Sequence, residues 1–126
     1  MSTARDDGLE LLRDMVPEMV DPATGDLRRA DGFATGLAEQ TLDAVFARLW
    51  TRPGLDRRSR SLVTLGILIA LRADNELRYH FPIALRNGLT RDELEEVVYH
   101  AAAYAGFPAA SAAGRTGRDV LGDTGP

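Results

Sequence analysis

The sequence predicts a single all-α domain of about six helices, spanning residues 1–126. Apolar residues recur at spacings of three and four along the chain, and no segment alternates as a half-buried strand would. Turn-forming and capping residues separate these periodic stretches at short intervals, which is typical of helices joined by short connections. A chain of 126 residues can bury one hydrophobic core, and it is too short to build two.

The first half of the chain contains two expected helices with a loop between them. Apolar residues from Leu9 to Met19 mark the first helix, which is interrupted or ends near Pro17. Turn formers dominate residues 20–32, so we expect a loop there. The second helix runs from about Gly36 to Trp50, and the sequence Arg52-Pro53-Gly54 ends it.

The third expected helix carries the most apolar stretch of the chain, SLVTLGILIALR at residues 61–72. It is apolar almost all round, so it should be a central buried helix or lie in a subunit interface. Asp56 can cap it, because a side-chain oxygen at this position accepts a free amide of the first turn. Asp74 or Asn75 is expected to cap a fourth helix, which ends at Asn87-Gly88, a left-handed C-terminal signal.

Two further helices complete the predicted domain. The sequence TRDE at residues 90–93 is a capping box, and it opens a fifth helix that extends through Tyr104. Pro108 can open the last helix, in which several alanines permit close packing against a neighbour.

The composition excludes several classes of chemistry. The chain has no cysteine, which rules out disulfides, thiol nucleophiles and thiolate metal sites. It has no lysine either, so Schiff-base chemistry is excluded and an anion site must use arginine. The net charge of −4 argues against a nucleic-acid or anionic-membrane partner. No apolar run reaches the ~20 residues of a membrane span, and the N-terminus has no apolar signal-peptide core, so a cytoplasmic location is expected.

Glu76 and His80 are the first candidates for chemistry. A spacing of four places both side chains on one face of a helix, where a solvated pair contributes only a few tenths of a kcal/mol. They do not form the zinc-protease HExxH motif, which needs two histidines on one face. A metal site with His100 is a second interpretation, and a catalytic pair is the third. Arg60 lies at the start of the apolar helix and could point inward to bind a carboxylate.

Four segments in order resemble the carboxymuconolactone decarboxylase family: LWTRPGLDRRSRSLVTLGILIAL, NELRYH, ALRNGLTRDELEEVV and YAGFPAASAA. The resemblance is strongest over residues 50–113, and residues 4–15 resemble the family's first helix more loosely. It implies a helical bundle that forms a homo-oligomer, a hexamer or a trimer. Ala73 and Glu76 stand where the alkyl hydroperoxidase branch has its CxxC cysteines, which excludes that thiol-dependent branch.

On this resemblance, we expect a carboxy-lyase that decarboxylates a small carboxylated lactone without a metal or other cofactor. The first substrate implied is 4-carboxymuconolactone, an intermediate of aromatic catabolism in the β-ketoadipate pathway. Arg60 would bind a carboxylate, His80 would deliver a proton to carbon, and Glu76 would orient the imidazole or hold it protonated. The other residues expected to bind substrate are Trp50, Tyr104 and Gly106.

Two departures from the family pattern leave other functions open. Pro82 stands where the family often has an arginine, and Phe46-Ala47-Arg48 replaces an aromatic-glycine-acid run. One alternative is a divergent decarboxylase or isomerase that acts on another lactone or keto acid in a biosynthetic pathway. The second is a non-catalytic oligomeric binding module, because a fold does not by itself imply a function.

Overall fold

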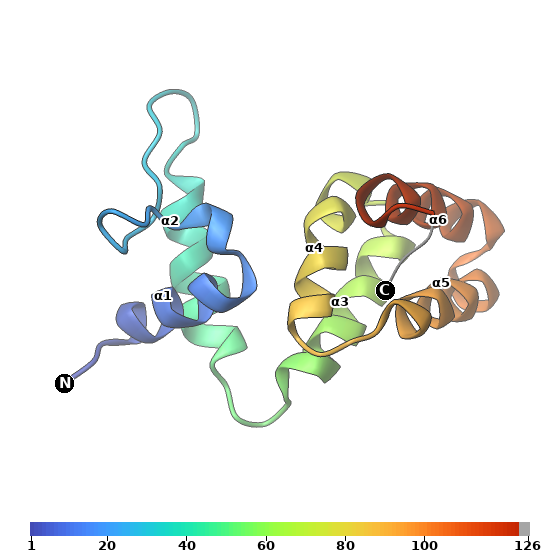
Figure 1. Ribbon diagram of the computed structural model, residues 1–126, viewed down its shortest axis with the longest axis horizontal. Coiled ribbons are helices and arrows are strands. Elements are labelled where there is room, and N and C mark those ends of the chain that lie inside the picture. The colour runs from blue at the N-terminus through green and yellow to red at the C-terminus, as the bar shows by residue number, and fades with distance from the viewer. Residues whose placement is uncertain (124–126) are drawn as a thin grey trace. The chain divides into compact units, whose positions relative to one another are not determined.

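The computed structural model describes residues 1–123, which form helices and no named strand (Figure 1). This architecture confirms the predicted all-α class. Contacts between Cα atoms divide the chain into two compact units, an N-terminal unit of residues 1–55 and a C-terminal unit that begins at Asp56. The single domain expected from the sequence stays a prediction. No helix among the described residues is both long and apolar enough to cross a membrane.

The N-terminal unit is built around two helices that cross closely. Helix α1 (Ala4–Met15) begins at a capping box on Thr3 and is followed by the short 3₁₀ helix η1 (Pro17–Met19). Helix α2 (Leu37–Thr41) continues directly into η2 (Leu42–Trp50), which has π-helical hydrogen bonding. The sequence predicted one regular helix over this second stretch. The structure instead has wider π turns from Leu42 to Trp50, which the spacing of apolar residues does not predict.

Gly8 allows α1 and η2 to approach each other because it has no side chain. A Cβ atom on Gly8 would lie 2.9 Å from the backbone and Cβ of Ala47, closer than real Cβ contacts. The buried side chains on either side of this crossing are Leu9, Leu12 and Met15 of α1 with Leu42, Phe46 and Trp50 of η2. These apolar contacts form the core of the N-terminal unit.

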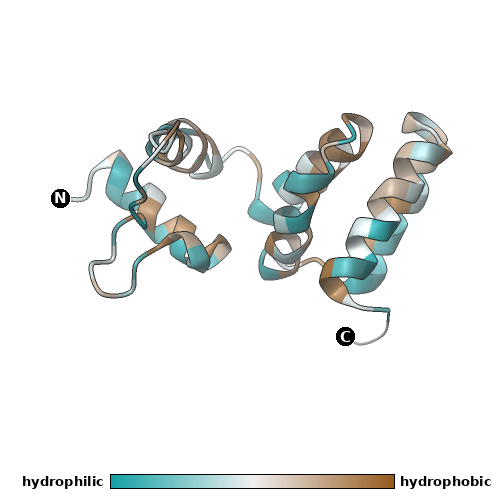
Figure 2. Ribbon diagram, turned by 90° about the horizontal axis from the view of Figure 1, so that it is seen from above, coloured by the Kyte–Doolittle hydropathy of each residue, from teal (hydrophilic) through white to brown (hydrophobic). Residues whose placement is uncertain are grey.

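The C-terminal unit consists of four helices: α3 (Arg57–Ala70), α4 (Asp74–Arg86), α5 (Arg91–Ala105) and α6 (Phe107–Leu121). Helix α3 packs against α4 and α5, and α6 covers α4 and α5. Each helix shows both hydrophobic and hydrophilic stretches, as expected where one face is buried (Figure 2). The shared core includes Leu65, Ile69, Leu77, Phe81, Leu94 and Ala113.

Most predicted helix boundaries of this unit are confirmed. Asp56 accepts a hydrogen bond from the backbone amide of Ser59 at 2.6 Å, and Thr90 forms the expected capping box. Gly88 adopts a positive φ of 101° after the end of α4, as the left-handed signal predicted. The cap expected at Asp74 or Asn75 is wrong, because Asp74 is already inside α4 and Ala73 precedes it.

The start of α4 is shifted because of the turn that precedes it. Arg72 adopts a left-handed conformation with φ of 59°, and the amide of Ala73 donates to the carbonyl of Leu68 at 2.9 Å. The chain therefore reverses within three residues, and the carbonyl of Ala73 already accepts the first hydrogen bond of α4, from Leu77. No side-chain oxygen caps this helix.

Helix α3 is less uniformly buried than its apolar sequence predicted. Its buried positions are Ser61, Leu65 and Ile69, which face α4 and α5. On the other side Val63, Ile67 and Leu71 form a stripe at spacings of four, and each is more than half exposed in the isolated chain. The alternative that α3 lies in a subunit interface therefore stays open as a prediction.

Candidate active site

Helix α4 carries Glu76 and His80 one turn apart, as their spacing predicted. The flanking residues Leu77 and Phe81 are fully buried in the core, whereas Glu76 is exposed and His80 is partly buried. His80 therefore lies at the border between the packed face of α4 and solvent. Such a border position lets a ring be shielded from water while one edge stays accessible to a small molecule.

The environment of His80 changes its protonation. Burial lowers the pKa of the His80 imidazole below its ordinary value, because a charged ring loses hydration there. The carboxylate of Glu76 raises the same pKa, which is the smaller of the two effects. Within residues 1–123 no hydrogen bond or ion pair joins the two side chains, so Glu76 acts on His80 through its electric field.

Arg60 lies in the first turns of α3, next to a buried hydrogen-bond network that ties α3 to α4. The side-chain amide of Asn87 donates to the hydroxyl of Ser61 at 2.9 Å, and Nε of Arg57 donates to the amide oxygen of Asn87 at 3.0 Å. The network fixes the start of α3 against the end of α4. The hydrogen bond between Ser61 and Asn87 was not predicted from the sequence, where Asn87 was named only as part of the signal that ends the fourth helix.

This network orients the face of α4 that bears the histidine. Residues seven apart on a helix share a face, so His80 lies on the side of α4 that Asn87 presents to α3. The rise of an α-helix separates His80 from Asn87 by about 10 Å along the axis. Arg60 is adjacent to Ser61 on α3, and the Glu76–His80 pair lies on α4, so the three residues stand on two packed helices.

Trp50 and Tyr104 lie in other surroundings. Trp50 is buried in the core of the N-terminal unit, where it packs at the end of η2. The Tyr104 side chain is 84% exposed, and its ring stacks on His100 with centroids 5.1 Å apart. Tyr104 and His100 line a cavity of about 550 Å³ between α3 and α5. Neither Arg60 nor the Glu76–His80 pair lines that cavity.

Gly106 connects α5 to α6 and has a backbone role in the structure. Its φ of 99° is a conformation that favours glycine, and its carbonyl accepts the first hydrogen bond of α6 from Ala110 at 3.1 Å. The substrate contacts expected for Trp50, Tyr104 and Gly106 stay predictions. Among residues 1–123 no cluster of three or more histidine, cysteine or acidic side chains is arranged to hold a metal ion.

Fold and site together define an all-α protein with an acid–histidine pair on one helix and an arginine on the adjacent helix. The chain belongs to the carboxymuconolactone decarboxylase family, whose model matches residues 36–116.

Two relatives carry names that state an activity. The chain is 45% identical over 80 residues to a 4-carboxymuconolactone decarboxylase of Acinetobacter baylyi, covering 64% of this chain and 60% of that protein. It is 40% identical over 104 residues to a nitrosuccinic acid decarboxylase of Metarhizium robertsii, covering 82% of this chain and 71% of the relative. An uncharacterised 15.0 kDa protein of Paracoccus denitrificans is 28% identical over 86 residues, covering 67% of this chain and 64% of that protein.

Proposed function

We propose that this protein is a carboxy-lyase that removes CO2 from a small organic acid, with 4-carboxymuconolactone as the first substrate to test. The observation that carries the proposal is the placement of Arg60, Glu76 and His80 on the packed helices α3 and α4, inside the segment that matches the family. The relative from Acinetobacter baylyi, named for this activity, supports the choice of substrate.

The reaction needs an electron sink, and the substrate itself supplies one. When the carbon–carbon bond to the carboxylate breaks, CO2 leaves and its bonding pair delocalises through the unsaturated lactone onto the carbonyl oxygen. The resulting dienolate takes a proton at carbon and becomes the product lactone. The protein has to bind the acid, stabilise the developing oxygen anion and deliver that proton.

The three residues suit these tasks. The Arg60 guanidinium binds a substrate carboxylate through two hydrogen bonds and fixes its orientation. The His80 imidazolium gives its proton to the dienolate carbon and is then reprotonated from solvent. Glu76 favours the charged ring, since its carboxylate raises the pKa of His80. Neither a metal nor an organic cofactor is required by this sequence of steps.

Nitrosuccinic acid is a second candidate substrate, because the relative named for its decarboxylation aligns with 82% of this chain. The chemistry is parallel: loss of the carboxylate next to the nitro group leaves a nitronate, which also takes a proton at carbon. Pro82 favours a substrate other than the lactone, since an arginine often found at this position of the family is missing. With either acid, Arg60 would bind a carboxylate and His80 would deliver the proton to carbon.

The test is CO2 release by the purified protein from 4-carboxymuconolactone and from nitrosuccinic acid, with succinate as a control that has no electron sink. We expect turnover of one of the two acids and none of succinate. The variant His80→Gln should lose this activity, and the matched variant His100→Gln should keep it. Absence of CO2 release from both acids would refute the proposed substrates, and acid binding without turnover would favour the non-catalytic module.

A further inference from the structure

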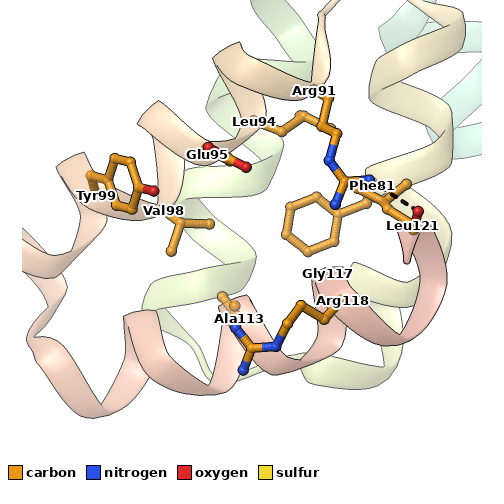
Figure 3. Close-up of a pocket in the computed structure, with 11 residues that line it drawn as sticks. Phe81, Arg91, Leu94, Glu95, Val98, Tyr99, Ala113, Gly117, Arg118 and Leu121 are labelled. Carbon is orange, nitrogen blue, oxygen red and sulfur yellow. Dashed lines mark hydrogen bonds between the residues drawn. The ribbon is translucent and has the colours of Figure 1, made fainter. Parts of the chain in front are cut away.

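A small cleft lies between α4, α5 and α6 (Figure 3). Arg60, Glu76 and His80 do not line it. Its volume is about 160 Å³, close to the roughly 150 Å³ of a cavity that holds benzene. The ring of Phe81 lies at its floor, and apolar walls are formed by Leu94, Val98 and Leu121. The cleft therefore matches one six-membered ring in size and in polarity.

Two glycines in the interior of α6 keep this cleft open. Gly114 and Gly117 both line it, although glycine is a poorer helix former than every residue except proline. Neither has a positive φ, so the backbone does not require glycine at these positions. A Cβ on Gly117 would lie 3.6 Å from the Phe81 ring, and one on Gly114 would lie 3.9 Å from a guanidinium nitrogen of Arg118.

Both distances are ordinary van der Waals contacts, so alanine would fit at either position. Alanine occupies the buried positions 109, 110, 112 and 113 of the same helix. Close packing of α6 therefore does not explain the two glycines. What alanine at either position would remove is part of the empty volume of the cleft that both glycines line.

The charged side chains around the cleft favour an anion. Nη1 of Arg91 donates to the carbonyl of Leu121 at 3.0 Å, and Nη2 donates to that of Gly122, so this cation already binds the end of α6. Arg118 forms no hydrogen bond or ion pair through its side chain within residues 1–123, and its guanidinium lies over Gly114 at the cleft. Glu95 lines the same cleft, and its charge disfavours a second carboxylate on the ligand.

We propose that this cleft binds a single-ring aromatic monocarboxylate, with its ring against the partly buried Val98 and Leu121 and its carboxylate on Arg118. Apolar contact of the ring with these two side chains and a charge-assisted hydrogen bond from Arg118 together recognise this class of molecule. The site is separate from the proposed decarboxylation, and it does not depend on that function. Phe81 follows His80 on α4, so an occupied cleft would touch the helix that carries the histidine.

The test uses benzoate as the probe and measures its binding by calorimetry and by amide chemical shifts in NMR spectra of the intact chain. Two further probes separate the contributions: benzyl alcohol keeps the ring without the charge, and acetate keeps the charge without the ring. We expect benzoate to bind more tightly than both. The variant Arg118→Gln should weaken benzoate binding about tenfold, and the matched variant Arg115→Gln, on the same helix but outside the cleft, should not change it.

The glycines provide an independent arm of the experiment. Gly117→Ala should weaken benzoate binding because its methyl group occupies the cleft, and it should raise the thermal unfolding midpoint because alanine favours the helix. A lower unfolding midpoint would show that Gly117 serves packing and would overturn the argument from the glycines. Absence of benzoate binding at millimolar concentration, or equal losses for Arg118→Gln and Arg115→Gln, would overturn the proposed site. None of these outcomes depends on CO2 release, so failure here is distinguishable from failure of the proposed function.

Discussion

Removal of the Ser61 hydroxyl should destabilise the C-terminal unit by a measurable amount. Ser61 is 2% exposed and Asn87 is 9% exposed, and their hydrogen bond joins α3 to α4 at 2.9 Å. In Ser61→Ala, the Asn87 amide loses its acceptor in a place that water does not reach. An unsatisfied buried donor costs about 1–3 kcal/mol, and the higher helix propensity of alanine offsets a few tenths of this cost.

The assay is urea unfolding followed by far-ultraviolet circular dichroism. With a denaturant dependence of about 2 kcal/mol per molar urea, a loss of 2 kcal/mol lowers the unfolding midpoint by about 1 M. The matched control is Ser111→Ala, because Ser111 is exposed on α6 and its substitution should change stability by no more than about 0.5 kcal/mol. Equal midpoints for the two variants would refute the argument that the buried hydrogen bond holds α3 against α4.

Four further predictions test the site and the fold. His80→Gln should abolish CO2 release in steady-state kinetics while the helical dichroism signal stays unchanged, because a proton donor is lost and the scaffold is kept. Arg60→Ala should raise KM roughly tenfold or more on the true substrate, and a change in kcat alone would contradict a binding role. Burial lowers the pKa of His80 in the folded state, so stability should fall as pH drops below the ordinary 6.5, and acid titration of His80→Gln should show a smaller loss. If the chain is one cooperative domain, Trp50 fluorescence and circular dichroism should report the same unfolding midpoint, and separate midpoints would contradict this.

Local chemistry made much of the fold predictable. Asp56, Thr90 and Gly88 mark helix ends because their caps depend only on residues within one turn, and the structure confirms them. The beginning of α4 was mispredicted because it depends on Arg72, an arginine in a left-handed conformation that no local preference indicates. The π turns of η2 are likewise absent from the apolar periodicity, which is similar for α- and π-helical stretches.

The site was predictable only in part, for a physical reason. A spacing of four on one helix is sufficient to place Glu76 and His80 on one face. Their relation to Arg60 depends on which helices pack together, and the Ser61–Asn87 hydrogen bond that fixes this packing joins residues 26 apart in the chain. Tyr104 shows the limit of such predictions, since it lies beside His100 in a different cavity.

The protonation of His80 connects its burial with the proposed chemistry. A proton donor has to carry its proton when the dienolate forms, yet burial alone favours the neutral ring in the protein without substrate. Glu76 opposes this effect, and the carboxylates of a bound substrate would raise the pKa of His80 further, because a negative charge nearby favours the imidazolium. The histidine would then become charged mainly when an anionic substrate is present, so that proton uptake accompanies binding. Under this scheme Glu76→Gln leaves burial unopposed, lowers the pKa of His80 and moves the alkaline limb of the activity profile to lower pH, whereas loss of activity without a shift of that limb would assign Glu76 a different role.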